Sequence, residues 1–390
     1  MHIAIVTGEA SGDILGSRLI KALYQHNPDI VFEGIAGKEM IAAGCTALYP
    51  MEKLAVMGFS EVLPRLRELL SIRKTLIKRW QRNPPDLFVG IDAPDFNLKL
   101  EASLHKKGIK TAHYVSPSLW AWRENRVKKI KGNLDQMLTL FPFEVDFYKK
   151  HHIPAIFVGH PLADEIPLST NQATHQATHQ ATNQQAAKKI LALKNAYTLA
   201  ILPGSRSGEI KRLAPDFLKA LTQLHKKHPD WQFIVPLINP QIRQQFEILL
   251  QQNAPQLPLK LIDSNSRTVM TAADQILMAS GTAVLEGMLI NRPMIAAYRV
   301  APLTAFIIRS FKMIKSRYYT LPNNLCNEAL VPELIQEQVT VKNIVQAVEK
   351  QFTQSQQTRE YCKQRFNEIH LQLRKNASQQ AAEVLFKLIK

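Results

Sequence analysis

A pair of carboxylates, Asp92 and Asp95, occurs in Gly-Ile-Asp-Ala-Pro-Asp-Phe-Asn, just after an apolar run at residues 87–91. The run predicts a buried strand, and open α/β sheets bind ligands beyond the carboxyl ends of their strands. Asp92 stands directly at that end, where a carboxylate can remove a proton from an attacking hydroxyl group. Pro94 fixes the turn, and Asp95 or Asn97 is expected to cap the next helix. Capping and turn formation are the alternative role for both acids.

Two loops of small residues in the second half of the chain have the composition of anion sites. The loop at 202–209 ends a strand-like run and enters a helix-like segment, whose first turn is expected to present free N–H groups. Arg206 can bind a phosphate through two parallel hydrogen bonds, which a lysine cannot do. A plain turn with a solvated arginine is the alternative.

The second loop, at 280–286, also opens a helix, and Glu286 could accept hydrogen bonds from ribose hydroxyls. Two such loops on one domain favour a site for a nucleoside diphosphate. The residues expected to hold it are Gly204, Ser205, Arg206, Ser280, Gly281, Thr282 and Glu286.

Two loops in the first half carry side chains suited to a substrate. The loop at 8–13 follows the first strand and lacks both G-x-G-x-x-G and the P-loop lysine, which argues against a dehydrogenase. Its serine and aspartate are expected to cap a helix, and capping alone is the alternative role. The stretch at 113–123 places two tryptophans beside serines and an arginine, which suits a sugar or acyl surface, whereas His113 is expected to be a core histidine. The substrate-loop candidates are Gly8, Ser11, Gly12, Asp13, Asp95, Ser116, Trp120, Trp122 and Arg123.

The elements that must position these residues alternate between short apolar runs and helix-period segments, which predicts an α/β protein with doubly wound parallel sheets. A four-residue Gln-Ala-Thr-His repeat at 171–184 has no large apolar residue and predicts an exposed linker or insertion. Strands are expected at 3–6, 31–35, 87–91, 111–115, 136–140, 156–158, 198–202, 232–235, 259–262, 275–278 and 294–298, and helices at 13–25, 61–80, 98–107, 120–131 and 379–389. The expected domains are 1–165 and 190–340, with a linker at 166–189 and C-terminal helices at 341–390 that could pack back on the first domain.

The charge balance, 49 lysines and arginines against 32 acids, gives +17 and predicts an anionic partner. Two basic segments, at 62–80 and 303–317, carry apolar stripes typical of interfacial helices, although core packing could also explain each stripe. No apolar run is long enough to span a membrane, no signal peptide precedes the first strand, and three distant cysteines fit a reducing compartment. We therefore expect a cytoplasmic protein that contacts the inner face of the membrane peripherally. The membrane-facing candidates are Leu66, Leu69, Leu70, Phe306 and Phe311.

The motifs at 8–13, 90–97, 114–123, 202–206 and 280–286 together resemble those of the lipid A disaccharide synthases, over nearly the whole chain. The resemblance implies a GT-B fold, in which two Rossmann-like domains face a cleft, and an inverting glycosyl transfer. The implied donor is UDP-2,3-diacylglucosamine, the acceptor is 2,3-diacylglucosamine 1-phosphate, and no metal or other cofactor is implied. The family's catalytic aspartate falls on Asp92, its essential arginine on Arg206 and its essential asparagine on Asn323. A turn after Pro322 is the alternative role for Asn323, and a homodimer is compatible with the sequence.

Two other functions compete with this interpretation. A UDP-sugar 2-epimerase shares the paired-domain architecture, but its substrates are soluble and leave the basic apolar stripes unexplained. A nucleic-acid-binding module would use the +17 charge. However, the aromatic residues are not interleaved along one basic face, so we expect no nucleic-acid partner.

Overall fold

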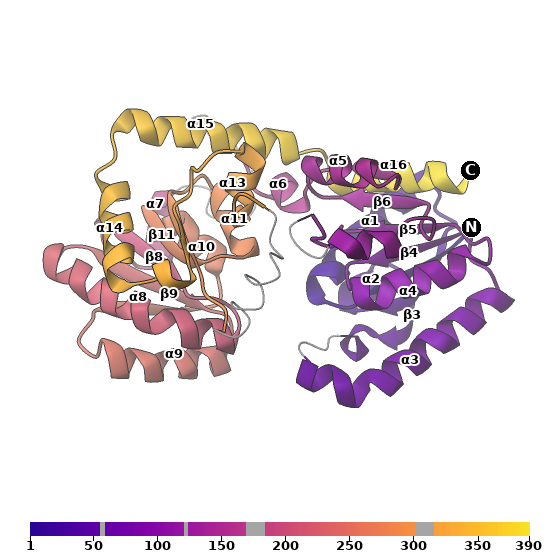
Figure 1. Cartoon of the computed structure of the whole chain (residues 1–390), viewed down its shortest axis with the longest axis horizontal. Helices are drawn as coiled ribbons and strands as arrows, with labels where there is room; N and C mark the ends of the chain where they lie inside the picture. Colours follow the sequence, from indigo (N-terminus) through magenta and orange to yellow (C-terminus); the bar gives the residue numbers. More distant parts are fainter. Residues whose placement is uncertain (55–58, 121–123, 169–183, 302–315) are drawn as a thin grey trace. The chain divides into compact units, whose positions relative to one another are not determined.

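A computed structural model describes residues 1–54, 59–120, 124–168, 184–301 and 316–390 (Figure 1). The chain divides into two compact units: unit 1 contains Met1–Asp164 and Gln372–Lys390, and unit 2 contains Glu165–Leu371. Each unit is built on its own parallel β-sheet with helices packed on both faces. The α/β class expected from the sequence is therefore confirmed.

The sheet of unit 1 has seven strands in the order β3-β2-β1-β4-β5-β6-β7, and every pairing is parallel. Its central strands are apolar throughout because helices cover both faces, so alternation is lost. The strands are β1 (His2–Thr7), β2 (Val31–Ala36), β3 (Cys45–Pro50), β4 (Leu87–Ile91), β5 (Thr111–Tyr114), β6 (Gln136–Thr139) and β7 (Ala155–Phe157).

The helices of unit 1 bury one stripe each against this sheet. On one face α1 (Ala10–His26) and α16 (Ala377–Ile389) contribute Leu19, Leu23 and Leu385 to the core. On the other face α3 (Phe59–Arg82) and α4 (Pro94–His105), which lie side by side in Figure 1, contribute Trp80 and Leu100. The remaining elements are α2 (Lys38–Ala42), α5 (Pro142–Lys150) and the short 3₁₀ helices η1 (Met51–Lys53) and η2 (Glu124–Lys129).

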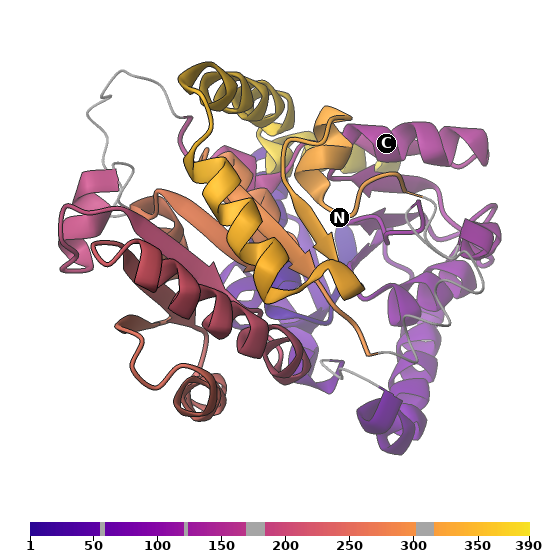
Figure 2. The same cartoon turned by 60° about the vertical axis from the view of Figure 1, so that its left-hand side comes forward.

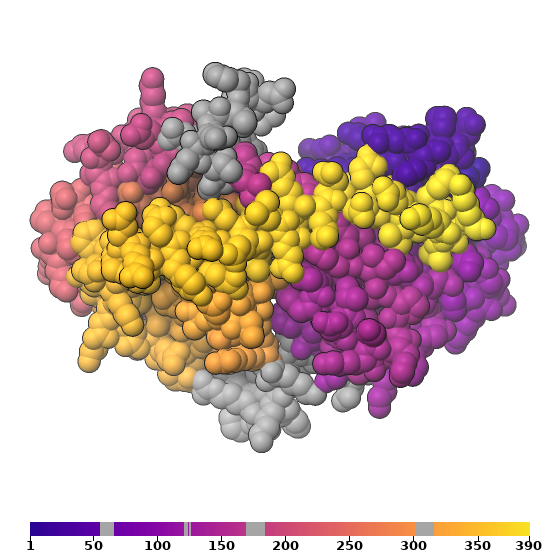
Figure 3. Space-filling model, turned by 90° about the horizontal axis from the view of Figure 1, so that it is seen from above, coloured from indigo at the N-terminus to yellow at the C-terminus, as the bar shows by residue number. Residues whose placement is uncertain are grey.

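The last helix returns the chain to unit 1. Helix α16 packs on α1, and its Ala381 and Ala382 are fully buried in the core of the unit. Both carboxylate oxygens of Asp164 accept hydrogen bonds from the first turn of α16, from the N–H of Asn376 at 2.9 Å and of Ala377 at 2.7 Å. Figure 3 shows this helix, in yellow, on the surface of the unit.

The sheet of unit 2 has six parallel strands in the order β10-β9-β8-β11-β12-β13. Helices α8 and α14 lie next to each other across one face, as Figure 2 shows, and share its main core. The strands are β8 (Thr198–Leu202), β9 (Gln232–Leu237), β10 (Leu259–Asp263), β11 (Gln275–Ala279), β12 (Met294–Tyr298) and β13 (Glu333–Ile335). The helices are α6 (Pro161–Glu165, at the boundary of the units), α7 (Gln184–Ile190), α8 (Ser207–Lys227), α9 (Pro240–Asn253), α10 (Ser266–Ala272), α11 (Thr282–Leu289), α13 (Leu321–Cys326), α14 (Val341–Phe352) and α15 (Gln356–Leu373), with η3 (Gln336–Gln338).

Every strand expected from the sequence is present, and β4, β8 and β12 have the expected bounds. The edge strands β3 and β13 were not expected. The helix expected at 120–131 is wrong, because the described part of that stretch forms only the 3₁₀ helix η2. The repeat expected to form a linker falls largely on residues 169–183, outside the described residues.

Each sheet has one point at which the order of its strands reverses. In unit 1 it lies between β1 and β4, and in unit 2 between β8 and β11. Doubly wound sheets bind ligands at the carboxyl edge of such a switch point. The loops after these four strands are the loops at 8–13, 90–97, 202–209 and 280–286 that the sequence singled out.

Candidate active site

The turn after β4 carries Asp92 in an unusual backbone conformation. Asp92 and Ala93 are both left-handed, with φ of 49° and 43°, and Asp92 is half-buried. Each such non-glycine residue costs about 1–3 kcal/mol and persists only where surrounding structure enforces it, a situation concentrated at functional sites. The N–H of Asp92 donates to the carbonyl of Tyr114, 2.9 Å away, which ties the turn to β5.

Neither residue expected to cap α4 does so. The N-cap position is Ala93, which has no side-chain acceptor. Asp95 is exposed and pairs with Arg126, whereas Asn97 is buried and points at the strand ends. The capping expectation is therefore wrong, because the left-handed turn starts the helix one residue earlier than the aspartate.

The loop after β1 lies against this turn. A Cβ atom on Gly8 would stand 3.0 Å from the Cβ of Ala93, and one on Gly12 would stand 2.1 Å from Oγ1 of Thr7. Both glycines are therefore required for close packing, and the structure brings Gly8 and the Asp92 turn together. Ser11 is exposed within α1.

Asp13 does not cap its own helix, whose N-cap is Glu9. Its buried carboxylate instead accepts from the N–H groups of Gly37, Glu39 and Met40 at 2.9 to 3.1 Å. These N–H groups begin the short helix α2, so Asp13 caps a different helix. Its oxygens are engaged by the chain itself, which departs from the substrate-loop expectation.

The strand end of β5 carries a third strained residue, Val115, with φ of 78°. The next residue, Ser116, shares a hydrogen bond of 2.9 Å with the hydroxyl of Tyr148. Burial raises the pKa of Glu144 to about 8, against the hydrogen bond from the N–H of Phe141 that acts to lower it.

The indole of Trp120 was expected to offer its N–H to a substrate. Its ring meets that of Phe143 edge-on, with the ring centroids 4.7 Å apart. The other two aromatic-loop candidates, Trp122 and Arg123, lie outside the described residues.

The loop after β8 is closed by its own carboxylate. Oε2 of Glu209 accepts hydrogen bonds from the N–H groups of Ser205 and Arg206 at 3.0 and 3.2 Å. Gly204 permits this, since it has φ of 121° and a Cβ there would stand 2.6 Å from that oxygen. Two N–H groups of the loop before α8 are thus occupied. The side chain of Arg206 stays 69% exposed, 3.7 Å from Glu209.

The loop after β11 is more open. Gly281 is the N-cap of α11, makes no side-chain cap, and has no atom within 4 Å of its Cβ position. Ser280 donates its N–H to the carbonyl of Ala297, and Thr282 begins the helix. Glu286, expected to meet a ribose, accepts from Nε of Arg267 at 2.5 Å.

Asn323 is buried and has a structural role. Its Oδ1 accepts from the N–H of Val331 at 2.8 Å, and its Nδ2 donates to the carbonyl of Val331 and to Oε1 of Glu333. The amide thus fixes α13 to β13 with both of its polar atoms. A turn after Pro322 does not describe the role of Asn323 fully, because its hydrogen bonds join α13 to β13 and to the residue Val331 before it.

The predicted membrane stripe on α3 divides into two parts. Leu66 and Leu70 are 43% and 44% exposed and Leu69 is half-buried, whereas Trp80, one of the stripe's apolar positions, is fully buried in the core. Phe306 and Phe311 lie outside the described residues. Among the helices that the structure describes, none has the length and apolar character needed to cross a membrane.

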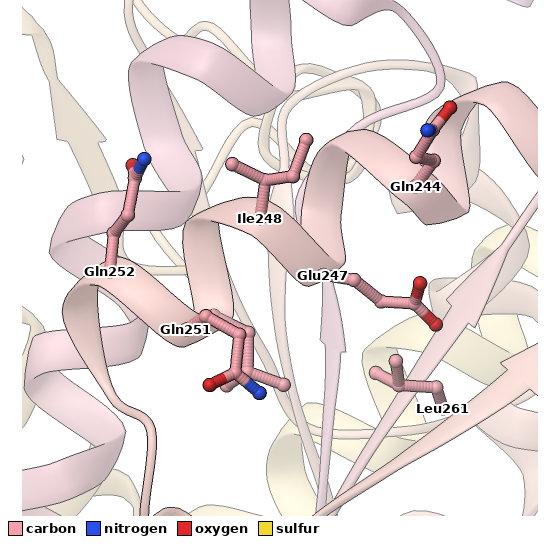
Figure 4. Close-up of a pocket in the computed structure, with 7 residues that line it drawn as sticks. Gln244, Glu247, Ile248, Gln251, Gln252 and Leu261 are labelled. Carbon is pink, nitrogen blue, oxygen red and sulfur yellow. The ribbon is translucent and has the colours of Figure 1, made fainter.

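No group of three or more histidine, cysteine or acidic side chains could hold a metal ion within the described ranges. An open hollow on α9, lined by Gln244, Glu247, Ile248 and Leu261 among others, contains none of the predicted site residues (Figure 4).

Two parallel-sheet α/β units with ligand loops at their switch points define the architecture of the GT-B glycosyltransferases and related sugar-nucleotide enzymes. Among solved structures, a UDP-GlcNAc 2-epimerase from Neisseria meningitidis bound to UDP-GlcNAc covers 99% of this chain and 100% of its own, with a TM-score of 0.64 and 15% identity. A glycosyltransferase from Rickettsia africae covers 100% and 98%, with a TM-score of 0.61 and 13% identity. These likenesses confirm the fold.

The sequence comparisons are more specific. The lipid-A-disaccharide synthetase family model matches residues 3–387. A lipid-A-disaccharide synthase from Alcanivorax borkumensis is 49% identical over 388 residues, which are 99% of this chain and 97% of the relative. One from Vibrio cholerae El Tor is 46% identical over 390 residues, 100% and 98%. The chain belongs to the lipid-A-disaccharide synthetase family, and is therefore a glycosyltransferase that forms the lipid A disaccharide.

Proposed function

We propose that the protein transfers a diacylglucosamine unit from UDP-2,3-diacylglucosamine to 2,3-diacylglucosamine 1-phosphate, forming a β-1,6 linkage and releasing UDP. Family membership supports the reaction, and the UDP-GlcNAc in the epimerase of the same fold supports a UDP-sugar donor. The observation that carries the mechanism is the strained turn of Asp92 and Ala93 at the switch point of unit 1.

In the proposed mechanism the carboxylate of Asp92 removes the proton from the acceptor's 6-hydroxyl as that oxygen attacks the anomeric carbon. The bond from that carbon to the UDP oxygen breaks on the opposite face, so the configuration inverts. The guanidinium of Arg206 and the N-terminus of α11 stabilise the negative charge that develops on the leaving diphosphate. No metal is required in this scheme, since arginine and helix termini supply the positive charge.

Asn323 acts indirectly in this proposal. Because both ends of its amide are bound to Val331 and Glu333, it supports the segment before β13 and does not hydrogen-bond substrate. Glu286 has one oxygen on Arg267 and keeps a second oxygen for a ribose hydroxyl.

A transfer assay tests the proposed reaction directly. Radiolabelled UDP-diacylglucosamine and the diacylglucosamine 1-phosphate acceptor should yield a labelled tetraacyl disaccharide phosphate, with one UDP released for each bond formed. Omitting the acceptor should leave the donor intact. Donor consumption without an acceptor, or formation of an epimer of UDP-GlcNAc, would contradict the proposal.

We also propose that unit 1 contacts an anionic membrane surface from the cytoplasmic side through the exposed part of α3. Leu66 and Leu70 are exposed beside Arg67, Lys74 and Lys78, which are exposed too. Apolar side chains flanked by lysine and arginine favour the interface of an anionic bilayer.

Replacing Leu66 and Leu70 with serine should lower binding to phosphatidylglycerol-containing vesicles several-fold in a sedimentation assay and leave the melting temperature within about 2 °C. Leu76→Ser is the matched control, since Leu76 is buried on the same helix. That variant should lose stability instead. Unchanged vesicle binding by the double variant would exclude this face of α3.

A further inference from the structure

A buried polar cluster, Asn97, Glu101 and His113, adjoins the Asp92–Ala93 turn and has no role in the mechanism above. All three side chains are at most 1% exposed. Asn97 and Glu101 stand one helical turn apart on α4, and His113 on β5 is the register partner of Gly90 on β4. Nδ1 of His113 lies 2.7 Å from Oε1 of Glu101.

The strand β4 makes room for this cluster. A Cβ atom on Gly90 would stand 2.1 Å from Oε1 of Glu101 and 2.9 Å from the Cβ of Asn97. The glycine therefore lies where the two polar side chains of α4 press onto the sheet. An ordinary core would place an apolar side chain at such a central strand position.

The cluster is also incompletely satisfied. Within the described part of the chain, Oδ1 of Asn97, Oε2 of Glu101 and Nε2 of His113 have no hydrogen-bond partner. Burial raises the pKa of Glu101. Burial also acts to lower the pKa of His113, but the neighbouring carboxylates of Glu101 and Asp92 outweigh it, so the pKa of His113 is raised. Well-packed apolar residues are often as stabilising as a buried charged pair, so stability alone does not explain this one.

The amide of Asn97 connects the cluster to the candidate base. Its Nδ2 lies 2.8 Å from the carbonyl oxygen of Asp92 and 3.3 Å from those of Val6 and Ile91. These carbonyls end β1 and β4, the two strands at the switch point. The backbone N–H of Asn97 also donates to the carbonyl of Ala93. The side chain of Asn97 thus holds Asp92, and its backbone makes the first helical bond of α4 to Ala93.

We infer that Asn97 is a positioning residue that keeps the Asp92–Ala93 turn left-handed and so fixes the Asp92 carboxylate for proton removal. The inference rests on the function proposed above for Asp92. It assigns Asn97 no contact with substrate. Its effect should therefore appear in kcat and not in KM, since misplacing a catalytic group slows the chemical step.

The test is a kinetic comparison of Asn97→Leu with the wild-type protein, because leucine has a similar volume and no donor. We expect kcat to fall about 10²-fold while KM for both substrates stays within about twofold. Thr139→Val is the matched control. Thr139 is a fully buried side chain on the same sheet whose hydroxyl donates to the carbonyls of Phe141 and Ile156, away from the turn. The Thr139→Val variant should lose stability and keep the kcat of the wild type.

A second substitution separates turn geometry from general damage. Glycine adopts left-handed conformations without the steric cost that alanine meets, so Ala93→Gly should relieve the turn of its need for Asn97. In the Asn97→Leu background it should restore kcat about tenfold. A folded Asn97→Leu variant with kcat within twofold of wild type would overturn the inference. So would an equal loss of kcat in Thr139→Val, or no recovery with Ala93→Gly.

Two further variants keep the outcomes distinct. If Asn97→Leu does not fold, Asn97→Ser, which keeps a shorter donor, takes its place: a lowered kcat at constant KM supports the inference, and an unchanged kcat overturns it. Asp92→Asn is assayed in parallel. If Asp92→Asn is inactive while the Asn97 variants are fully active, only the positioning role fails; if Asp92→Asn is active, the proposed base itself fails.

Discussion

The switch points of the two sheets occupy equivalent places in their units but use different chemistry. In unit 1 the loop after β4 contains two left-handed non-glycine residues, Asp92 and Ala93, held by a buried amide. In unit 2 the left-handed residue after β8 is Gly204, and small residues also form the loop after β11. The carboxyl edge of the unit 1 sheet, the strained edge, fixes a single side chain in a strained backbone. The carboxyl edge of the unit 2 sheet, the glycine-rich edge, keeps an unstrained backbone near the surface.

This difference matches what each partner in a glycosyl transfer requires. A general base must meet one proton at one distance, so its carboxylate benefits from a rigid support. A diphosphate spreads its charge over several oxygens and is held by backbone N–H groups and a guanidinium, which glycines allow to approach closely. Substitutions at the two edges should therefore fail in different ways.

The largest expected effect is at the strained edge. Asp92→Asn keeps the shape of the side chain and removes the base, so kcat should fall by about 10² to 10⁴. The affinity for UDP, measured by calorimetry, should stay within about twofold. If UDP binding weakened as much as turnover, the two edges would not have separate roles.

At the glycine-rich edge, Arg206→Ala should lower kcat by about 10² to 10³ and weaken UDP binding as well. Arg206→Lys is the informative control, since it keeps the charge and loses the paired hydrogen bonds. Its kcat should lie between those of the wild type and Arg206→Ala. Equal activity of lysine and arginine here would mean that charge alone is needed.

Stability as a function of pH gives the third prediction. Burial raises the pKa of Glu144 to about 8, from about 4.5 in the unfolded chain, so the folded state holds a proton that the unfolded state has lost. The free energy of unfolding should therefore decrease as pH rises from about 4.5 to 8 and level off above that. Glu144→Gln should flatten this decrease in melting scans; an unaltered slope would assign it to another group.

His160 provides the opposite sign within the same unit. Burial lowers its pKa to about 4, so the unfolded state takes up a proton first as the pH falls. Stability should drop between about pH 6.5 and 4, and the drop should remain in Glu144→Gln.

The smallest effect concerns Glu209, whose carboxylate already occupies two N–H groups of the glycine-rich edge. Glu209→Gln keeps an oxygen for those groups and removes a negative charge from the vicinity of Arg206. UDP should then bind a few-fold more tightly in calorimetry at low salt, and the gain should shrink as salt screens the charges. Weaker binding would show that Glu209 supports the loop more than it repels the nucleotide.

The sequence was sufficient for the central elements and the location of the loops. Strands such as β4 and β8 are buried on both faces, which leaves an apolar run that composition reveals. The edge strands β3 and β13 are only partly buried, so their sequences, Cys-Thr-Ala-Leu-Tyr-Pro and Glu-Leu-Ile, carry no such signal. The carboxyl-edge rule then placed the candidate residues on the correct side of each sheet.

The hydrogen-bond partners of the site residues could not be predicted, because they are remote in sequence or belong to other elements. Asp13 binds a helix that begins 25 residues later in the chain, at Lys38, and Asn323 binds Val331 in the segment before β13. His113 was correctly expected in the core, but its pairing with Glu101 depends on the register of β4 and β5.

The return of α16 to unit 1 has a consequence for how the protein forms on the ribosome. Ala381, Ala382 and Leu385 complete a core whose other members come from the first 164 residues. That core cannot close until unit 2 has been synthesised, a delay on the order of 10 to 40 s at ~5–20 residues per second. The first unit to emerge is thus the last to be finished, and the apolar surface of α1 that α16 covers stays open until then.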